Sequence, residues 1–317
     1  MSDQLYDDPF RFFFELIQNA DDSKLPALLI PTIRFTVRQT ELVVESNESG
    51  FSLADVLSIC NTGESSKSKD ATTIGEKGFG FKSVFGIASR VHVQSKLWSF
   101  RFEHQRDQDG LGMVSPIWEA VPARHGDFPT CFTLCYAEGD KDMSDYLCKQ
   151  FERQSETIIW ALRQVQVLEI IFENVSSLHK KIRFDRSSFM LSPRSQIRAS
   201  RDESSTQYMY WRKEGMISGM PARAGRTSDE SRVQIAFPIT NAQNYAPRLS
   251  ALGECVFAVL PVCRLSQLPF MIQADFVLPA SRQTVSQTTW NQKLRSGIVR
   301  VFAQAVRDMT ATKCRSI

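Results

Sequence analysis

The segment from residue 9 to residue 22 constrains the fold most, because its spacing predicts a helix with two chemically different faces. Asp8 offers a carboxylate cap, and Pro9 suits the first turn, where its missing N–H costs nothing. Apolar side chains then recur at helical spacing, which predicts a face packed against a core. These side chains belong to Phe10, Phe13, Phe14 and Ile17.

Three polar residues form a column on the other side of the same helix. Glu15, Asn19 and Asp22 stand at positions i, i+4 and i+7, one above another. A solvated polar face would give the same pattern, and it is the commoner explanation for an isolated motif. A second motif further along the chain favours a functional interpretation.

The second motif is a group of glycines, Gly75, Gly78 and Gly80, that precedes an apolar stretch. This stretch predicts a buried helix over residues 79–88. Glycine N–H groups can approach an anion closely because no Cβ intervenes, and a helix N-terminus attracts negative charge. The segment therefore predicts phosphate binding. Such glycines also form ordinary turns, and the run lacks the spacing of a P-loop or a dinucleotide-binding fingerprint.

An acidic turn lies between the two motifs. A short strand predicted over 41–46 leads into this turn, residues 47–50, which contains Glu48 and Gly50. A capping box then begins a helix predicted over 52–60. An acidic side chain at a strand end can accept a hydrogen bond from an exocyclic amine, as adenine would require.

The order of these motifs resembles the GHKL ATPase superfamily, which has the Bergerat fold and includes the ninety-kilodalton heat-shock chaperones. The motif sequences FELIQNADD, SNESGF and IGEKGFGFKSVF are most similar to the sacsin and NO VEIN branch. The motifs cover residues 6 to about 136, and a weaker similarity continues to about 303. The resemblance implies an α/β (α+β sandwich) class with a Bergerat-type mixed sheet covered by helices on one face.

The resemblance also implies a role for each motif residue. Glu15 would be the general base that activates water, Asn19 would hold Mg²⁺ against the phosphates of ATP, and Asp22 would belong to the nucleotide pocket. Glu48 would accept from adenine, and Thr130 would line the adenine side of the pocket. The residues expected to bind the nucleotide are Asn19, Asp22, Glu48, Gly50, Gly75, Lys77, Gly78, Phe79, Gly80, Phe81, Lys82 and Thr130.

Two positions depart from the family's pattern and predict an altered base pocket. The family usually has D-x-G-x-G at the adenine turn, where this chain has Glu48 in place of the aspartate and one glycine fewer. Pro129 precedes Thr130, where the chaperones have glycine.

The length of 317 residues and a hydrophobic fraction of 42% predict about two domains with sizeable cores. We expect an ATP-binding domain over residues 1–175, with a polar lid over 61–74, and a smaller α+β domain over 176–317. A solvated loop would also explain the lid segment, although loops of this length are often functional covers. The second domain resembles the middle domain of the chaperones, whose arginine reaches the γ-phosphate. Arg282 is the candidate here, and a local ion pair is the equal alternative.

Hydrophobic patterning predicts the remaining elements of the first domain. A near-continuous apolar strand over 167–173 would close its sheet. A long helix is expected over 145–162. Further strands are predicted over 28–37, 90–96, 98–104 and 130–136.

A basic segment follows the first domain. Between Lys180 and Arg226 there are eleven Lys or Arg residues against four Asp or Glu, mixed with Tyr208, Tyr210 and Trp211. Basic groups interleaved with aromatics suit nucleic acid. A solvated loop and an ordinary strand are the commoner explanation, since the net charge of the chain is only +3.

The composition favours a soluble protein of the cytosol or nucleus. No apolar run approaches the ~18 to 20 residues of a membrane span, and the N-terminus does not resemble a signal peptide. We therefore expect no membrane partner. Seven cysteines without metal-binding spacing predict reduced thiols and no zinc site.

Together these features predict Mg²⁺-dependent ATP binding with slow hydrolysis, an ATPase activity that drives lid and domain rearrangement in a chaperone-like role toward a protein client. The alternative is a nucleotide-sensing or scaffolding module with weak or no ATPase activity, whose partner is a protein or a nucleic acid. Glu15 favours the first function, and the altered adenine turn favours the second.

Overall fold

A computed structural model describes most of the chain. The described ranges are 9–60, 80–104, 111–121, 128–137, 139–140, 142–154, 157–177, 180–191, 194–201, 208–223, 228–239, 256–258, 260–263, 268–279 and 284–313. The chain divides into two compact units, Met1–Ser155 with Leu162–Phe184, and Glu156–Ala161 with Asp185–Ile317. The strand β8 (Lys181–Leu191) begins in the first unit and ends in the second.

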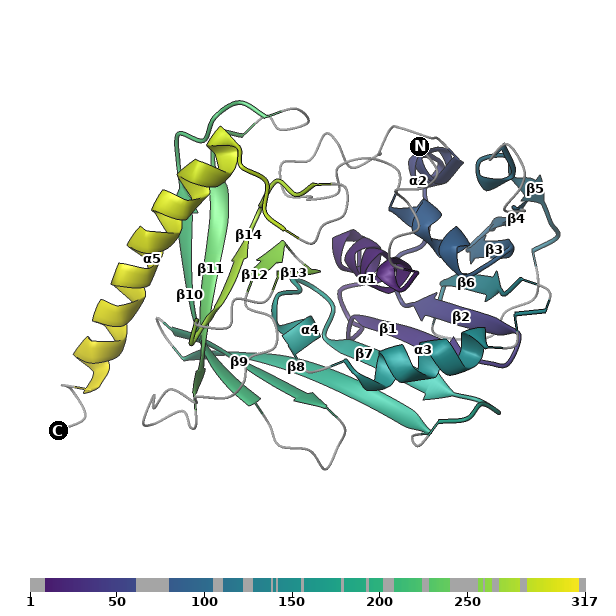
Figure 1. Ribbon diagram of the computed structural model, residues 1–317, viewed down its shortest axis with the longest axis horizontal. Coiled ribbons are helices and arrows are strands. Elements are labelled where there is room, and N and C mark those ends of the chain that lie inside the picture. Colours follow the sequence, from purple (N-terminus) through teal and green to yellow (C-terminus); the bar gives the residue numbers. More distant parts are fainter. Residues whose placement is uncertain are drawn as a thin grey trace. The chain divides into compact units, whose positions relative to one another are not determined.

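The sheet of the first unit has the strand order β7-β1-β2-β6-β3-β4-β5 (Figure 1). Its strands are β1 (Thr32–Val37), β2 (Glu41–Ser46), β3 (Arg90–Ser95), β4 (Trp98–Glu103), β5 (Ile117–Trp118), β6 (Thr130–Cys135) and β7 (Val167–Phe172). The pair β1 and β7 is parallel, and the other neighbours are antiparallel. This mixed sheet, with its helices, confirms the predicted α+β class. The apolar strand predicted over 167–173 does extend the sheet, as β7 beside β1.

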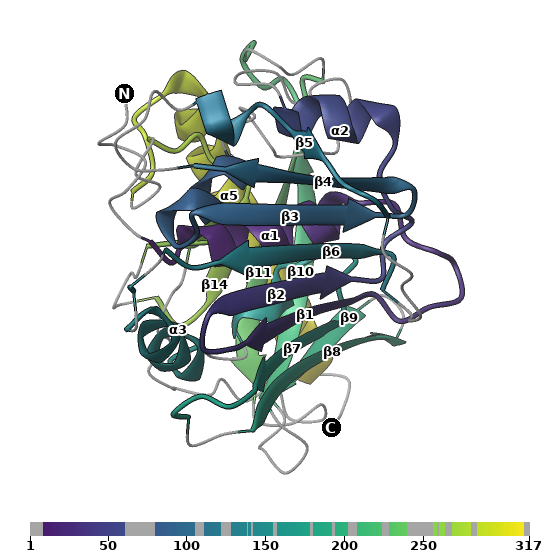
Figure 2. The same cartoon turned by 90° about the vertical axis from the view of Figure 1, so that its right-hand side faces the viewer.

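Helices of the first unit pack on one face of this sheet. They are α1 (Arg11–Asp22), α2 (Leu53–Cys60) and α3 (Met143–Glu152), with the short 3₁₀ helices η3 (Phe81–Gly86) and η4 (Leu111–Met113). Phe13 of α1 joins two elements, because its ring lies 4.9 Å from that of Phe35 on β1 and 5.0 Å from that of Phe151 on α3. In Figure 2 the strands run across the front and α1 lies behind them.

Two predicted helices differ from the structure for local reasons. The helix predicted over 79–88 is the six-residue 3₁₀ helix η3. There the N–H and hydroxyl of Ser83 both donate to the carbonyl of Gly80, at 3.2 and 2.6 Å, which favours the tighter turn. The helix predicted over 145–162 is two helices, because the side-chain amide of Gln154 donates to Gln150 O and closes the end of α3.

The predicted strand over 28–37 also begins later, as β1 at residue 32. Pro31 precedes β1, and a proline has no N–H for a strand ladder. The other predicted strands and the first two helices agree with the structure within one or two residues.

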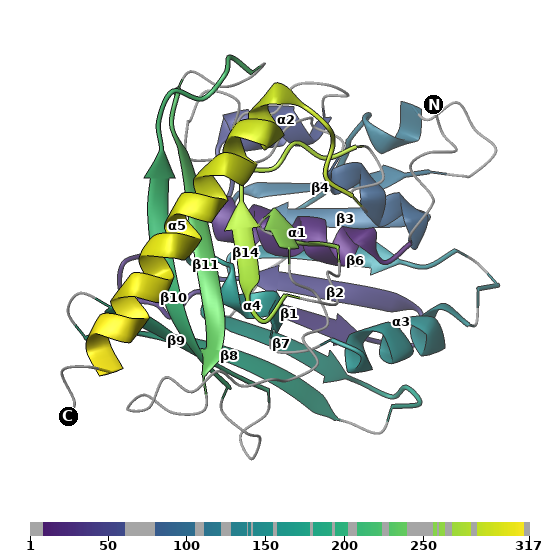
Figure 3. The ribbon, with the colours of Figure 1, turned by 60° about the vertical axis from the view of Figure 1, so that its left-hand side comes forward.

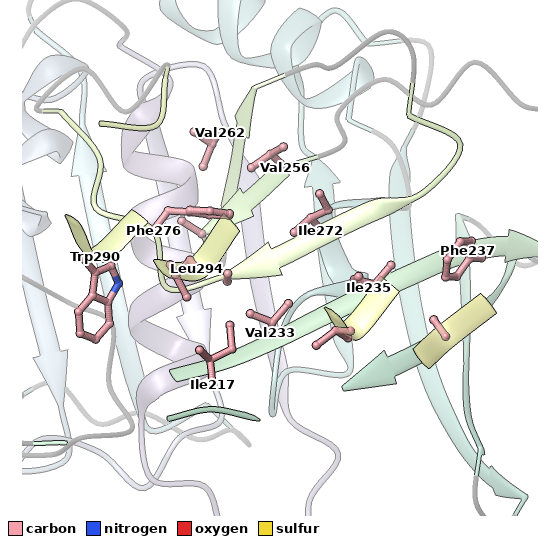
Figure 4. Packing of buried hydrophobic residues seen from close by; sticks show 14 of the residues in the cluster. Ile217, Val233, Ile235, Phe237, Val256, Val262, Ile272, Phe276, Trp290 and Leu294 are labelled. Atoms are coloured by element: carbon pink, nitrogen blue, oxygen red, sulfur yellow. The ribbon is translucent and has the colours of Figure 1, made fainter. Parts of the chain in front are cut away.

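The second unit contains a sheet with the strand order β13-β12-β14-β11-β10-β9. Its elements are α4 (Thr157–Trp160), β9 (Arg194–Arg201), β10 (Tyr208–Ile217), β11 (Ser231–Ile239), β12 (Val256–Ala258), β13 (Leu260–Cys263), β14 (Met271–Ala274) and α5 (Thr289–Lys313). The long helix α5 lies along β10 and β11 (Figure 3). Figure 4 shows part of the apolar core of this unit, which includes Leu294 of α5 together with Val233, Ile235 and Ile272.

The approach of α5 to β10 requires a glycine on each element. A Cβ at Gly297 would collide with the side chain of Ile217, and a Cβ at Gly215 would collide with Val301. Among the described residues, no helix combines the length and the apolar character needed to cross a membrane.

Asp21 fixes the end of α1 to the first unit's sheet. Its side chain is fully buried, and its Oδ1 accepts hydrogen bonds from the backbone N–H groups of Arg163, Gln164 and Val165 at 3.0, 2.7 and 2.9 Å. These residues lead directly into β7. One carboxylate therefore satisfies three main-chain donors and holds the end of α1 beside the segment that leads into β7.

We predict that Asp21→Ala lowers the unfolding free energy by about 3 kcal/mol, because it leaves buried N–H groups without an acceptor. Urea denaturation measures this change. Lys24→Ala is the control, since Lys24 is exposed and should change stability by less than about 0.5 kcal/mol. A loss below about 1 kcal/mol for Asp21→Ala would contradict the anchoring role.

Candidate functional site

The first part of the candidate site is the contact between Glu15 and Gly80. The Glu15 side chain is buried, with 5% of the residue exposed, and Arg11 Nε approaches its Oε1 at 3.4 Å. A Cβ at Gly80 would collide with the other carboxylate oxygen of Glu15. The structure thus brings the predicted base against the last glycine of the predicted phosphate-binding segment, where any larger residue would displace the carboxylate.

The acidic turn forms the second part, and its main chain is tied to the segment that follows α1. The N–H of Ser49 donates to the carbonyl of Lys24 at 2.8 Å. Asn47 Oδ1 accepts from Thr32 N at 2.8 Å, and its Nδ2 donates to Ile30 O at 2.7 Å. The amide of Asn47 is therefore used to hold the backbone. Glu48, with 5% exposure, is the acidic side chain that the turn provides.

Thr130 lies at the same end of the sheet as the acidic turn. It is fully buried, and its register partners are Ser46 on β2 and Ser95 on β3. The hydroxyls of Thr130 and Ser95 are 2.7 Å apart, and Ser95 Oγ accepts from the N–H of Phe51 at 2.8 Å. Two hydroxyls thus connect the ends of β3 and β6 to Phe51, the residue after the turn.

Asn19 and Asp22 continue the polar column of α1. Asn19 is half-buried, and its carbonyl accepts a hydrogen bond from Ser23 Oγ at 2.7 Å. Asp22 forms an ion pair with Arg163, so it contributes to the same anchor as Asp21. The helical rise places Glu15 and Asp22 about 10 Å apart along the axis of α1.

Phe81 and Lys82 direct their side chains into the core of the first unit. The ring of Phe81 is 5.5 Å from that of Phe132. Lys82 is 4% exposed, and its Nζ donates to the carbonyls of Ile59, at 2.6 Å, and Met113. Burial lowers the pKa of Lys82 to about 8. The Lys82 amine is therefore engaged by main-chain oxygens.

The other predicted site residues lie outside the described ranges. They are Gly75, Lys77, Gly78, Phe79 and Arg282. The predicted lid over 61–74 also lies outside them. Across the described ranges, no three or more His, Cys, Asp or Glu side chains form a group that could hold a metal ion.

Sequence reasoning missed three residues that shape the site: Asp21, Ser95 and Arg163. A carboxylate next to Asp22 at the end of a helix could have signalled the anchor. No sequence feature distinguished Ser95 or Arg163 from other polar residues.

Two aromatic residues of the basic segment are buried. Tyr210 and Trp211 are 1% and 2% exposed, so neither ring is open to base stacking. Lys181 and Arg183 both contact Glu169, at 2.6 and 2.7 Å. The described part of this segment therefore uses its aromatics for packing and part of its charge for ion pairs.

Comparison with known proteins gave two similarities, and no family model matches the chain. The chain is 29% identical over 327 residues to Protein NO VEIN of Arabidopsis thaliana, covering 97% of the chain and 12% of that protein. It is 31% identical over 102 residues to the putative type II restriction enzyme HgiDII of Herpetosiphon aurantiacus, covering 30% of the chain and 16% of that protein. The chain thus spans only a small part of either relative. The first similarity supports the predicted NO VEIN-like branch.

The acidic turn requires a glycine at position 50, which we predict is costly to replace. Gly50 has φ +78°, and a Cβ there would lie 2.7 Å from the Lys96 side chain. A residue with a Cβ loses about 1–2 kcal/mol of stability when its φ is positive. We expect Gly50→Ala to lower the unfolding free energy by more than this amount, because its Cβ would also contact Lys96. Gly139→Ala is a matched control, because Gly139 has φ +87° and open space around it.

Thermal or urea unfolding of both variants separates backbone strain from the steric contact. The double variant Gly50→Ala with Lys96→Ala should lose the excess cost and match Gly139→Ala. Equal losses for Gly50→Ala and Gly139→Ala would contradict a steric role for Lys96.

Proposed function

We propose that the first unit binds ATP with Mg²⁺ and hydrolyses it slowly, with Glu15 as the general base. The observation that carries this proposal is the buried Glu15 carboxylate against Gly80, the last glycine of a segment suited to phosphate. Arg11 and the packing of α1 keep the carboxylate in place. A carboxylate one water away from a bound phosphate can orient that water and accept its proton.

The side chains present fit a nucleotide with its metal ion. Asn19 offers an amide oxygen one helical turn from Glu15, and a hard cation such as Mg²⁺ prefers oxygen ligands and takes few of them from protein. When bound, Mg²⁺ supplies charge neutralisation at the phosphates. We propose Asn19 as its protein ligand. Phosphate would be held by Gly75, Lys77, Gly78, Phe79 and Gly80.

The acidic turn is proposed as the site of the base. Glu48 is an acceptor suited to an exocyclic amine, and the amide of Asn47 is already committed to Ile30 and Thr32. Thr130 and Gly50 belong to the same strand end, and we propose Asp22 as a further residue of the nucleotide pocket.

Hydrolysis would drive a rearrangement of the lid over 61–74 and of the second unit, with Arg282 as the proposed contact to the γ-phosphate. An arginine suits charge on phosphoryl oxygens because its planar donors match them. By its resemblance to the chaperones, the chain would act on a protein client.

We predict that Glu15→Gln keeps the affinity for Mg·ATP within ~3-fold and reduces turnover ~10²-fold or more, because only proton transfer is lost. Titration calorimetry measures binding, and a phosphate-release assay measures turnover. Glu41→Gln, a carboxylate of β2 that pairs with Arg38, is the control and should leave turnover unchanged. Equal turnover of Glu15→Gln and wild type would refute the assignment. Removal of Mg²⁺ by a chelator should stop turnover in every variant.

We predict that Glu48→Ala weakens ATP binding by about 10- to 100-fold and removes a preference for ATP over GTP. The reason is that GTP presents an acceptor where adenine presents an amine. Asn47→Ala is the matched variant, and it should lower stability while preserving the ratio of ATP to GTP affinity. The opposite pattern would move the acceptor role from Glu48 to Asn47.

The second candidate function is a scaffold or sensor that binds nucleic acid, favoured by the similarity to a protein named as a putative restriction enzyme. The basic segment between Lys180 and Arg226 would supply the contacts. Binding of duplex DNA measured at 50 and 200 mM salt decides this alternative, because phosphate contacts by Lys and Arg weaken steeply with salt. The buried Tyr210 and Trp211 make the ATPase the better supported function.

A further inference from the structure

Lys82 is a buried lysine whose amine is held by the main chain of two other elements. It belongs to η3, and its Nζ donates to the carbonyls of Ile59, near the end of α2, and Met113, at the end of η4. The ring of Phe102 on β4 lies 4.7 Å from the same nitrogen. A cation over an aromatic face is stabilised by the ring quadrupole. One side chain therefore fastens η3 to three elements.

The interactions of Lys82 hold the start of η3, next to the contact between Gly80 and Glu15, the proposed general base. Gly80 is the N-cap of η3, two residues before Lys82, and its carbonyl accepts from both the N–H and the hydroxyl of Ser83. Its α-carbon lies against the Glu15 carboxylate. A displacement of η3 would therefore move the backbone that limits the position of Glu15.

A lysine in a glycine-rich phosphate segment is usually interpreted as a phosphate ligand. Here the residue is only 4% exposed, and the hydrogen bonds of its ammonium go to carbonyl oxygens. Phe81 and Phe102 surround it, at 5.7 and 4.7 Å from their ring centroids. Contact with a phosphate would require the ammonium to break these interactions. The geometry favours a role within the protein.

We propose that Lys82 is a positioning residue, which fixes the backbone at Gly80 against Glu15 and so supports the rate of ATP hydrolysis and not the affinity for ATP. This inference rests on the proposed function. It differs from the role that the sequence motif suggests for Lys82, since the lysine acts through Gly80 and touches no substrate.

The first experiment compares wild type with Lys82→Met, which retains an apolar stem and removes the charge and the donors. Calorimetry measures the affinity for Mg·ATP, and a steady-state assay measures turnover at saturating ATP. We expect an affinity within ~3-fold of wild type and a turnover lower by ~10-fold or more, because small displacements of a catalytic group are costly. A tenfold loss of affinity with unchanged turnover would identify a phosphate ligand and overturn the inference.

The pH dependence of turnover tests the role of Lys82 separately from protein stability, because a general loss of stability would not alter its shape. Burial lowers the pKa of Lys82 to about 8, and the other titratable group that interacts with it is Cys60, whose pKa burial raises. Turnover of wild type should fall as the pH rises through about 8, when the ammonium loses its charge. Cys60→Ser should retain this fall. The same fall in Lys82→Met would overturn the inference.

A nucleotide-free experiment separates the inference from the proposed function. Urea unfolding gives the unfolding equilibrium constant of wild type, Lys82→Met, Glu15→Gln and the double variant. We expect the constant of the double variant to differ by ~3-fold or more from the value that the two single changes give when multiplied together. Multiplicative effects would overturn the positioning role. Coupling in a protein that binds no ATP would support the contact and refute the ATPase. If Lys82→Met does not fold, Lys82→Gln, which retains a donor, replaces it in the cycle.

Discussion

The hydrogen bonds between the Asp21 carboxylate and the backbone at residues 163–165 determine where α1 lies, and the rest of the candidate site follows from α1. The helix carries Glu15 and Asn19 on one face. Its C-terminal end continues to Lys24, whose carbonyl holds the N–H of Ser49 in the acidic turn. A shift of α1 would thus move the proposed base and the proposed adenine contact together. A buried carboxylate is costly unless its lone pairs are occupied, and the three N–H groups of this segment meet that requirement.

Two of the three carboxylates of α1 have their role fixed by the fold. Asp21 accepts from the main chain, and Asp22 pairs with Arg163. Glu15 forms an ion pair with Arg11, four residues earlier on the same helix, and its other carboxylate oxygen lies against Gly80. Its position against Gly80 makes this buried acid a better candidate for chemistry than Asp21 or Asp22.

Local periodicity made most of the first unit predictable. The apolar stripe of α1 and the alternation in β2, β3 and β4 need no tertiary information. Two helix predictions failed where a side chain hydrogen-bonds to a backbone carbonyl. Ser83 does so at Gly80, and Gln154 does so at the end of α3. Which of the two adjacent aspartates accepts hydrogen bonds from three backbone N–H groups also depends on the segment that approaches α1 from residue 163, far away in the sequence. Lys82 shows the same limit, because its motif suggests a phosphate ligand and only the fold reveals its carbonyl partners.

The helix α1 separates two tasks that a nucleotide site must perform. Base recognition would depend on the turn at residues 47–50, which hydrogen-bonds to the chain just beyond the end of α1. Chemistry would depend on Glu15, about two turns away, where Gly80 limits its position. A rigid helix keeps the distance between these points constant, so changes at one end alter affinity or preference without moving the other. An exchange within the turn at residues 47–50 would therefore leave the arrangement of Glu15 against Gly80 intact.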